Sequence, residues 1–113
     1  MIGPSQWEPD VHHAPLAGPD EKWFCSEFER AFHQRPDYPA AQAFVVGIVV
    51  IECLRRARTL EDESLLRAAH SLDTTTLYGR FRLDPATSRQ IGHRALLVQW
   101  RSGRKVVIED GAS

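Results

Sequence analysis

The sequence predicts an α/β fold, a small three-layer-like unit with about three helices and a C-terminal β-hairpin or sheet. Apolar residues recur at helical spacing in three successive segments between Asp20 and Leu72. After Asp73, apolar and polar residues alternate as they do in half-buried strands. The 113 residues, 42% of them hydrophobic and 26% charged, suffice for one modest core. We expect one domain over 1–113, made of an extended lead-in (1–19), a helical region (20–72) and a mainly β region (73–113).

Prolines delimit the lead-in and the first helix. Four prolines and two glycines precede Asp20, so this stretch is expected to be extended or irregular, with a short strand near Ser5 to Glu8. From Asp20 to about Gln34 the apolar residues keep helical spacing, and Glu21 adds negative charge where it favours a helix start. The helix is expected to end before Pro36, because a residue that precedes proline is pushed out of the helical region.

The second helix is expected to run from Pro39, a favourable first-turn residue, to about Arg58. Its middle, AFVVGIVVI from Ala43 to Ile51, is apolar on every face, unlike a surface helix. Because a bilayer span takes ~20 apolar residues, this stretch is too short to cross a membrane and must be buried in protein. Gly47 is expected to permit close packing there. A second subunit or other parts of a longer protein must cover it, since two other helices and a few strands cannot surround it.

A third helix and a set of strands complete the predicted fold. Thr59 and Asp62 have the spacing of a capping box at a helix start. The buried stripe of that helix would be Leu65, Leu66, Ala69 and Leu72. Strand alternation then runs from Leu77 to Leu83, and DPATSRQ supplies turn residues. Two further strands, 95–100 and 104–108, flank Ser102-Gly103 and predict a tight hairpin, with Trp100 in the core.

No combination of side chains predicts catalysis or a metal site. His12 and His13 lie in the proline-rich lead-in without further ligands at metal-binding spacing, and a metal site needs three or four converging ligands. The sequence has no nucleophile elbow and no glycine-rich phosphate loop. Cys25 and Cys53 lack the spacing of a zinc or redox motif and are expected to be buried free thiols. We therefore expect a protein that is not an enzyme and that has no catalytic residue, metal or cofactor.

The charges are spread unevenly over a chain whose net charge is −1. The segment from Gly79 to Ile108 has a net charge of +6, which leaves −7 for the remainder. Its basic residues are interleaved with apolar ones, which is typical of a solvated strand face, although such a segment can also hold an anionic partner such as RNA. The charged residues of this segment are Arg80, Arg82, Arg89, Arg94, Arg101, Arg104 and Lys105, against Asp84 alone.

Two long segments resemble parts of a known family. FERAFHQRPDYPAAQAFVVGIVVIECLRRA resembles a pair of late helices, with Tyr38, Pro39 and Gln42 in the familiar places. LYGRFRLDPATSRQIGHRALLVQWRSGRKVVI resembles the closing strands, and its matching features are Gly79, the turn after Asp84-Pro85, the Gly92-His93 pair and the terminal hairpin. Together they resemble the final third of the substrate-binding proteins of ABC transporters for branched-chain amino acids and amides, from about Gly3 to Ile108. Ser88 departs from the pattern, because the family usually has glycine there.

This resemblance implies the type 1 periplasmic-binding fold, in which two α/β lobes close over a ligand. The family chain crosses between lobes near the segment that matches GPSQWEP, so the resemblance implies that Gln6 and Trp7 border the ligand cleft. It also implies a transporter permease as partner and a place outside the cytoplasmic membrane, although the N-terminus MIGPSQWEPDVHH lacks the features of a secretory signal. The first two-thirds of the family fold, which supply most ligand contacts, have no counterpart in this sequence.

Three hypotheses about function follow. The first is a truncated or stand-alone C-terminal piece of a substrate-binding protein, which self-associates through the surfaces that its missing parts would cover. The second is a dimeric receptor for a small amino acid or amide, whose cleft the partner subunit completes. The third is a module that holds an anionic partner with its basic C-terminal hairpin. The charge balance argues against nucleic acid as the main partner, and no membrane insertion is expected.

Overall fold

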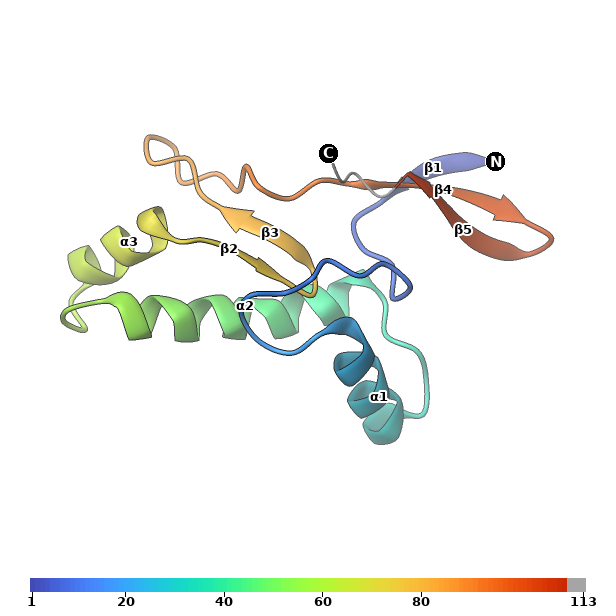
Figure 1. Cartoon of the computed structure of the whole chain (residues 1–113), viewed down its shortest axis with the longest axis horizontal. Helices are drawn as coiled ribbons and strands as arrows, with labels where there is room; N and C mark the ends of the chain where they lie inside the picture. Colours follow the sequence, from blue (N-terminus) through green and yellow to red (C-terminus); the bar gives the residue numbers. More distant parts are fainter. Residues whose placement is uncertain (110–113) are drawn as a thin grey trace.

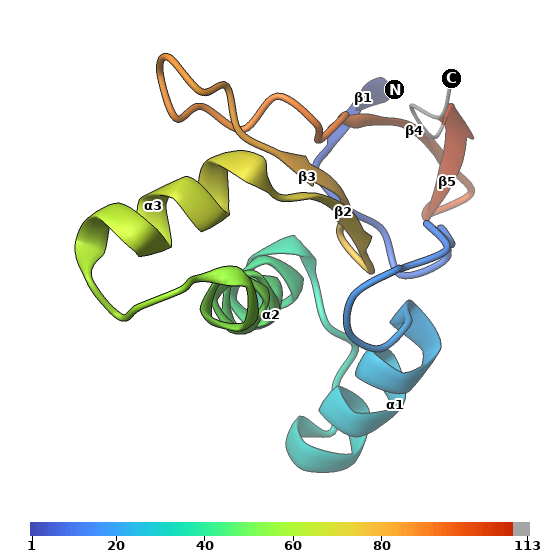
Figure 2. The same cartoon turned by 60° about the vertical axis from the view of Figure 1, so that its left-hand side comes forward.

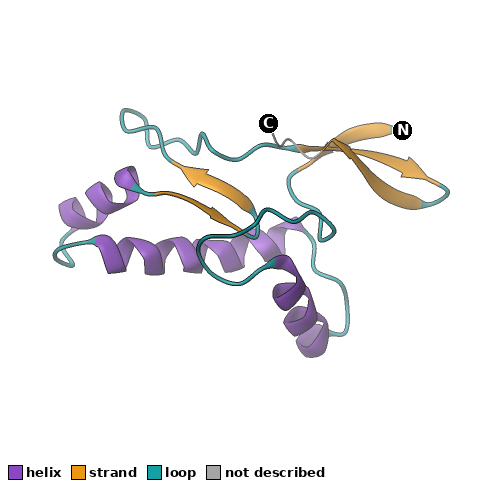
Figure 3. Ribbon diagram, in the orientation of Figure 1, coloured by secondary structure: helices purple, strands orange, loops and turns teal. Residues whose placement is uncertain are grey.

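The computed structural model describes residues 1–109 and confirms an α/β fold with three helices and antiparallel strands (Figures 1 and 3). The helices are α1 (Glu21–Phe32), α2 (Tyr38–Arg56) and α3 (Asp62–Ser71). The strands are β1 (Ile2–Ser5), β2 (Asp73–Thr76), β3 (Gly79–Arg82), β4 (Leu96–Arg101) and β5 (Arg104–Glu109). The end of the predicted β region, 110–113, lies outside the described residues.

Helices α1 and α2 lie where the sequence signals place them, within two residues at each end. The Asp20 carboxylate caps α1 by accepting a hydrogen bond of 2.9 Å from the Trp23 amide. The helix ends at Phe32, and His33 after it takes the left-handed backbone conformation, with φ 59°. Pro39 occupies the first turn of α2, where the absent N–H would have no helical partner.

The start of α3 differs from the prediction. The helix begins at Asp62, and Thr59 does not cap it. The Thr59 Oγ1 instead accepts a hydrogen bond of 3.3 Å from the Glu61 amide within the loop. The residues that the helix buries are Ser64 and Ala68. Of the expected stripe, Leu72 just after the helix is fully buried, whereas Leu66 is 52% exposed.

The strands also correct part of the prediction. The expected strand from Leu77 to Leu83 is the second half of a hairpin, because β2 turns at Leu77 and Tyr78 before β3 begins at Gly79. The strand expected near Ser5 to Glu8 lies earlier, as β1. The terminal hairpin is confirmed, and Ser102 and Gly103 have φ values of 51° and 76°, the positive pair that a type I′ turn requires.

The strands form two separate sheets (Figure 2). One has the order β1-β4-β5 and is antiparallel throughout, with Ile2 opposite Gln99 and Ser5 opposite Leu96. The other is the two-stranded hairpin β2-β3. The lead-in is therefore held in register by a strand from the far end of the chain.

The core is small and lies at the N-terminal half of α2. It joins α2 to α1, to the lead-in and to the turn of the β2-β3 hairpin through the buried residues Trp7, Phe24, Ala41, Val45 and Leu77. The rings of Phe24 and Phe44 lie beside each other there, with centroids 5.0 Å apart. This cluster covers one side of α2 as far as Val49.

From Val46 onward, α2 has an uncovered apolar face. Val46, Val50, Ile51 and Leu54 are 57%, 51%, 51% and 44% exposed, so this chain does not supply the all-round burial that the sequence predicts. No neighbouring atom lies within 4 Å of a Cβ placed at Gly47, so the close packing expected there is absent as well. Helix α2 is long and apolar enough to cross a membrane. The core helix of a soluble protein can meet the same criterion of length and composition.

The chain is more extended than a closed domain of its length. Its Cα radius of gyration is 15.5 Å, whereas a compact domain of this length has a radius of about 13 Å. Its accessible surface is 7735 Å², and a compact monomer of this mass exposes about 6,300 Å². The chain therefore exposes roughly 1,400 Å² more than a closed domain would.

Candidate ligand-binding site

Gln6 and Trp7, the residues that the resemblance places beside a cleft, have different surroundings. Gln6 is exposed, whereas Trp7 is 2% exposed. The Trp7 Nε1 donates a hydrogen bond of 3.0 Å to the Leu77 carbonyl oxygen, and its ring meets the Phe24 ring edge-on at 6.1 Å between centroids. Trp7 therefore ties the lead-in to the turn of the β2-β3 hairpin.

Two hollows lie beside these residues. The first has a volume of about 360 Å³ and is lined by residues of β1, the start of α2 and the β4-β5 hairpin, among them Gln6, Tyr38, Trp100 and Lys105. The second, of about 230 Å³, is lined among others by Trp7, Glu8, Arg35 and Tyr38. Ser5, Tyr38 and Lys105 border both hollows, so we call the two together the Tyr38–Lys105 site.

The side chains of the Tyr38–Lys105 site can hold a small polar molecule without covalent chemistry. The Lys105 Nζ lies 3.2 Å from the Glu8 carboxylate and 5.3 Å from the centroid of the Trp100 ring. Trp100 is 49% exposed, so its expected place in the core is wrong, and its ring is available to the hollow. Aromatic faces, an ammonium group and the Gln6 amide are the kinds of groups that orient a small zwitterion or amide.

Gly79 and His93, which the resemblance also singles out, fasten the connection between β3 and β4. Gly79 has φ 125°, and a Cβ there would lie 3.3 Å from the His93 Nδ1. The His93 ring stacks on Tyr78, with centroids 4.6 Å apart. Burial lowers the pKa of His93, while hydrogen bonds to the backbone of Gln6 and Tyr78 act in the opposite direction. The His93 Nε2 is buried without a hydrogen-bond partner in the described part of the chain.

A buried carboxylate pairs with His12, a contact that spacing along the sequence does not indicate. The His12 Nδ1 lies 2.8 and 3.0 Å from the two carboxylate oxygens of Glu21, which is 4% exposed. Over residues 1–109, no group of three His, Cys, Asp or Glu side chains could hold a metal ion. Cys25 and Cys53 are partly buried free thiols, and burial raises the pKa of each, which disfavours a nucleophilic thiolate.

The basic residues of the C-terminal segment are partly paired with carboxylates. Arg80 donates two hydrogen bonds, of 2.9 and 2.7 Å, to Asp73, and these bonds lower the pKa of the Asp73 carboxyl. Lys105 pairs with Glu8. Arg80 and Lys105 are therefore neutralised by carboxylates of this chain, which reduces the charge that the C-terminal segment offers to an anionic partner.

Two solved structures contain this arrangement of helices and strands. An ABC-type branched-chain amino acid transporter from Rhodopseudomonas palustris matches 96% of this chain over 29% of its own, with a TM-score of 0.74 and 18% identity. An ABC transporter from the same organism matches 68% of this chain over 23% of its own, with a TM-score of 0.60 and 19% identity. The chain shares the fold of part of these proteins. No protein-family model matches the sequence, and no curated protein matches it significantly.

The shared fold agrees with the resemblance that the sequence segments carry. The chain spans less than a third of the length of the solved structures that it matches. Most of their fold therefore has no counterpart in this sequence.

Proposed function

We propose that this chain is a non-catalytic C-terminal segment of a solute-binding protein that serves an ABC transporter for amino acids or amides. The observation that carries the proposal is a match over 96% of this chain to 29% of a branched-chain amino acid transporter structure. In this role the complete protein would hold a solute between its lobes and deliver it to a membrane permease.

The uncovered face of α2 is the association surface in this proposal. We define it by Val46, Val50, Ile51 and Leu54, and call it the α2 face. The missing parts of the fold would cover it in a longer protein, and a second copy covers it when the chain is alone.

Sedimentation velocity of matched variants tests this surface. The wild-type chain is expected to sediment as a dimer or larger species, and the double variant Val50→Glu, Ile51→Glu as a monomer, because each charge would be desolvated in the interface. Leu60→Glu is the control, since Leu60 lies in the loop after α2 and is 77% exposed. A wild-type monomer, or equal dissociation by Leu60→Glu, contradicts the proposal.

The Tyr38–Lys105 site supports a second function, a receptor for a small amino acid or amide whose cleft a partner subunit completes. The observation that favours this function is the pair of adjoining hollows that Tyr38 and Lys105 both line. Gln6 lines one hollow and Trp7 lines the other. Gln6 would contact the ligand directly, and Trp7 would hold the lead-in beneath it.

Thermal unfolding with a panel of amino acids and short amides tests the receptor function. A ligand at ~100 times its dissociation constant adds roughly 2.7 kcal/mol to the free energy of unfolding. Gln6→Ala is expected to lose this stabilisation, and Gln34→Ala, at an exposed position outside the site, to keep it. An unchanged melting curve across the panel would exclude the receptor and leave the association proposal standing.

A further inference from the structure

A third hollow lies at the end of the molecule away from the Tyr38–Lys105 site. It sits between the end of α2 and helix α3, has a volume of about 480 Å³, and lies at the opposite end of the long axis from β1, β4 and β5 (Figure 1). Its polar lining residues are Arg56, Arg58, Ser64, Arg67, His70 and Ser71. We call it the arginine pocket.

The arginine pocket has no acidic residue in its lining, although three arginines belong to it. Arg56 lies in the last turn of α2, where a positive charge is favourable against the helix dipole without any ligand. That explanation does not apply to Arg58, beyond the helix, or to Arg67, in the middle of α3. In the part of the chain that the structure describes, neither forms an ion pair with a carboxylate.

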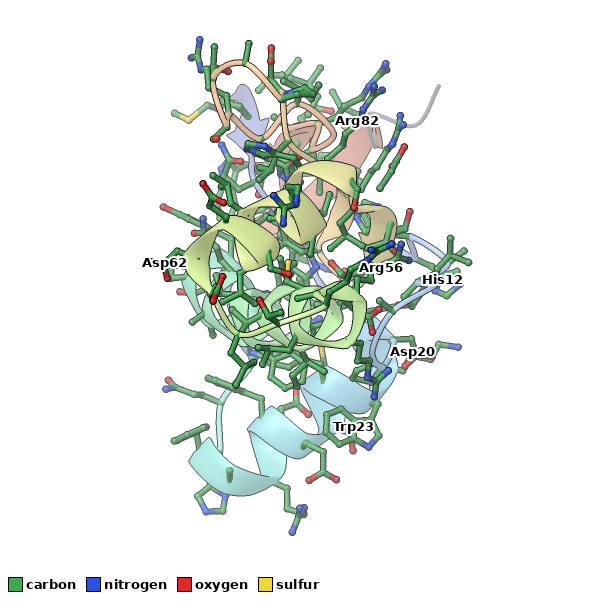
Figure 4. The ribbon with its side chains drawn as sticks, turned by 90° about the vertical axis from the view of Figure 1, so that its left-hand side faces the viewer. His12, Asp20, Trp23, Arg56, Asp62 and Arg82 are labelled. Atoms are coloured by element: carbon green, nitrogen blue, oxygen red, sulfur yellow. The ribbon has the colours of Figure 1, made fainter. Side chains whose placement is uncertain are left out.

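The nearest acidic cluster in the sequence does not neutralise this pocket. Glu61, Asp62 and Glu63 stand at the start of α3, and none of them lines the hollow. Figure 4 views the molecule from this end and shows Asp62 and Arg56 on opposite sides of it. Glu63 and Arg67 have the helical spacing of an ion pair, yet no such pair is present between them in the described structure.

Ser64 supplies a hydrogen-bond donor at the wall of the pocket. It is 7% exposed, and its Oγ accepts hydrogen bonds of 3.0 and 3.1 Å from the amides of Arg58 and Thr59. Both bonds use the oxygen as acceptor, so the hydroxyl proton is still available, and it makes no hydrogen bond to another described residue. An anion in the pocket would accept that proton as a hydrogen bond.

We propose that the arginine pocket binds a phosphate-bearing anion. Guanidinium groups match the geometry and charge of phosphate oxygens, and a buried hydroxyl donor adds direction to the contact. A free phosphorylated solute and a lipid headgroup share this chemistry, and the experiment separates them.

Inorganic phosphate and lipid vesicles are the two probes. Phosphate binding to the full chain is followed by isothermal titration calorimetry, and vesicle binding by cosedimentation with phosphatidylcholine, with and without phosphatidic acid. The double variant Arg58→Gln, Arg67→Gln is expected to weaken binding at least tenfold. The control Arg82→Gln, Arg104→Gln removes the same charge from exposed positions on other elements and is expected to bind as the wild type does.

Each outcome decides the proposal. Binding of phosphate without binding of vesicles assigns a free solute as the ligand. Vesicle binding that needs phosphatidic acid assigns a lipid headgroup. Either assignment requires that the pocket variant loses the binding and the control variant keeps it. Equal loss in the control variant means attraction by net charge and overturns the site. Absence of binding by the wild-type chain to either probe overturns it as well.

Discussion

Replacing Trp7 by phenylalanine should destabilise the chain far more than the same change at Trp23. Trp7 is 2% exposed and donates a hydrogen bond to the Leu77 carbonyl, whereas Trp23 is 50% exposed and contacts Phe44 at 6.1 Å between ring centroids. The Trp7→Phe change leaves a buried carbonyl without its donor, which costs about 1–3 kcal/mol. The smaller ring leaves a void that costs about 1 kcal/mol more. We expect a loss of about 2–4 kcal/mol for Trp7→Phe.

The assay is urea unfolding followed by far-ultraviolet circular dichroism, at one fixed protein concentration because association contributes to apparent stability. Figure 4 shows Trp23 on α1, in the lower half of the molecule in that view. Trp23→Phe is expected to change the free energy of unfolding by less than about 0.5 kcal/mol. Equal effects of the two substitutions would refute the view that Trp7 ties the lead-in to the β2-β3 hairpin.

Two further predictions concern Gly79 and His93. Gly79→Ala forces a side chain into φ 125° and places its Cβ 3.3 Å from the His93 Nδ1, so we expect a loss of about 1–3 kcal/mol. Thermal unfolding checks this against Gly3→Ala, whose Cβ would meet nothing within 4 Å, and similar melting temperatures would contradict it. Burial lowers the pKa of His93 in the folded state, so the unfolded chain binds the proton more readily and stability falls as the pH drops below about 6.5. Urea midpoints measured across that range should lose part of this slope in His93→Gln but not in His33→Gln, and an unaltered slope in His93→Gln would count against it.

Local signals predicted the helices well because their causes are local. Asp20 caps α1 through a residue three positions away, and Pro39 starts α2 by its own geometry. The left-handed φ of 60° at Ser88 fits the glycine that the resembling family usually has there. The prediction for Thr59 was wrong because a threonine hydroxyl can either cap a helix or accept a hydrogen bond within a loop. Here it accepts a hydrogen bond from the Glu61 amide within the loop.

The candidate sites could not be predicted in the same way, because they depend on contacts between distant segments. The Trp7 indole meets a carbonyl on Leu77, and Lys105 meets Glu8 only once β1 has paired with β4. The pairing of His12 with Glu21 depends on the path of an irregular lead-in. Trp100 follows the alternation of a buried strand, yet its side chain is 49% exposed.

The exposure of the α2 face is the largest difference between the fold and the sequence-based prediction. The all-apolar segment of α2 predicts that protein surrounds the helix, whereas the described structure leaves Val46, Val50 and Ile51 more than half exposed. This difference between the sequence pattern and the fold is the reason for proposing that the α2 face is an association surface.

Small-angle X-ray scattering of the purified chain over a range of concentrations tests the central claim most directly, because one experiment gives both mass and radius of gyration. The account predicts a particle of at least twice the 12.8 kDa chain mass. The α2-face double variant should return to the single-chain mass. A wild-type particle of 12.8 kDa with a radius of gyration near 15.5 Å at every concentration would contradict the claim that this face is an association surface.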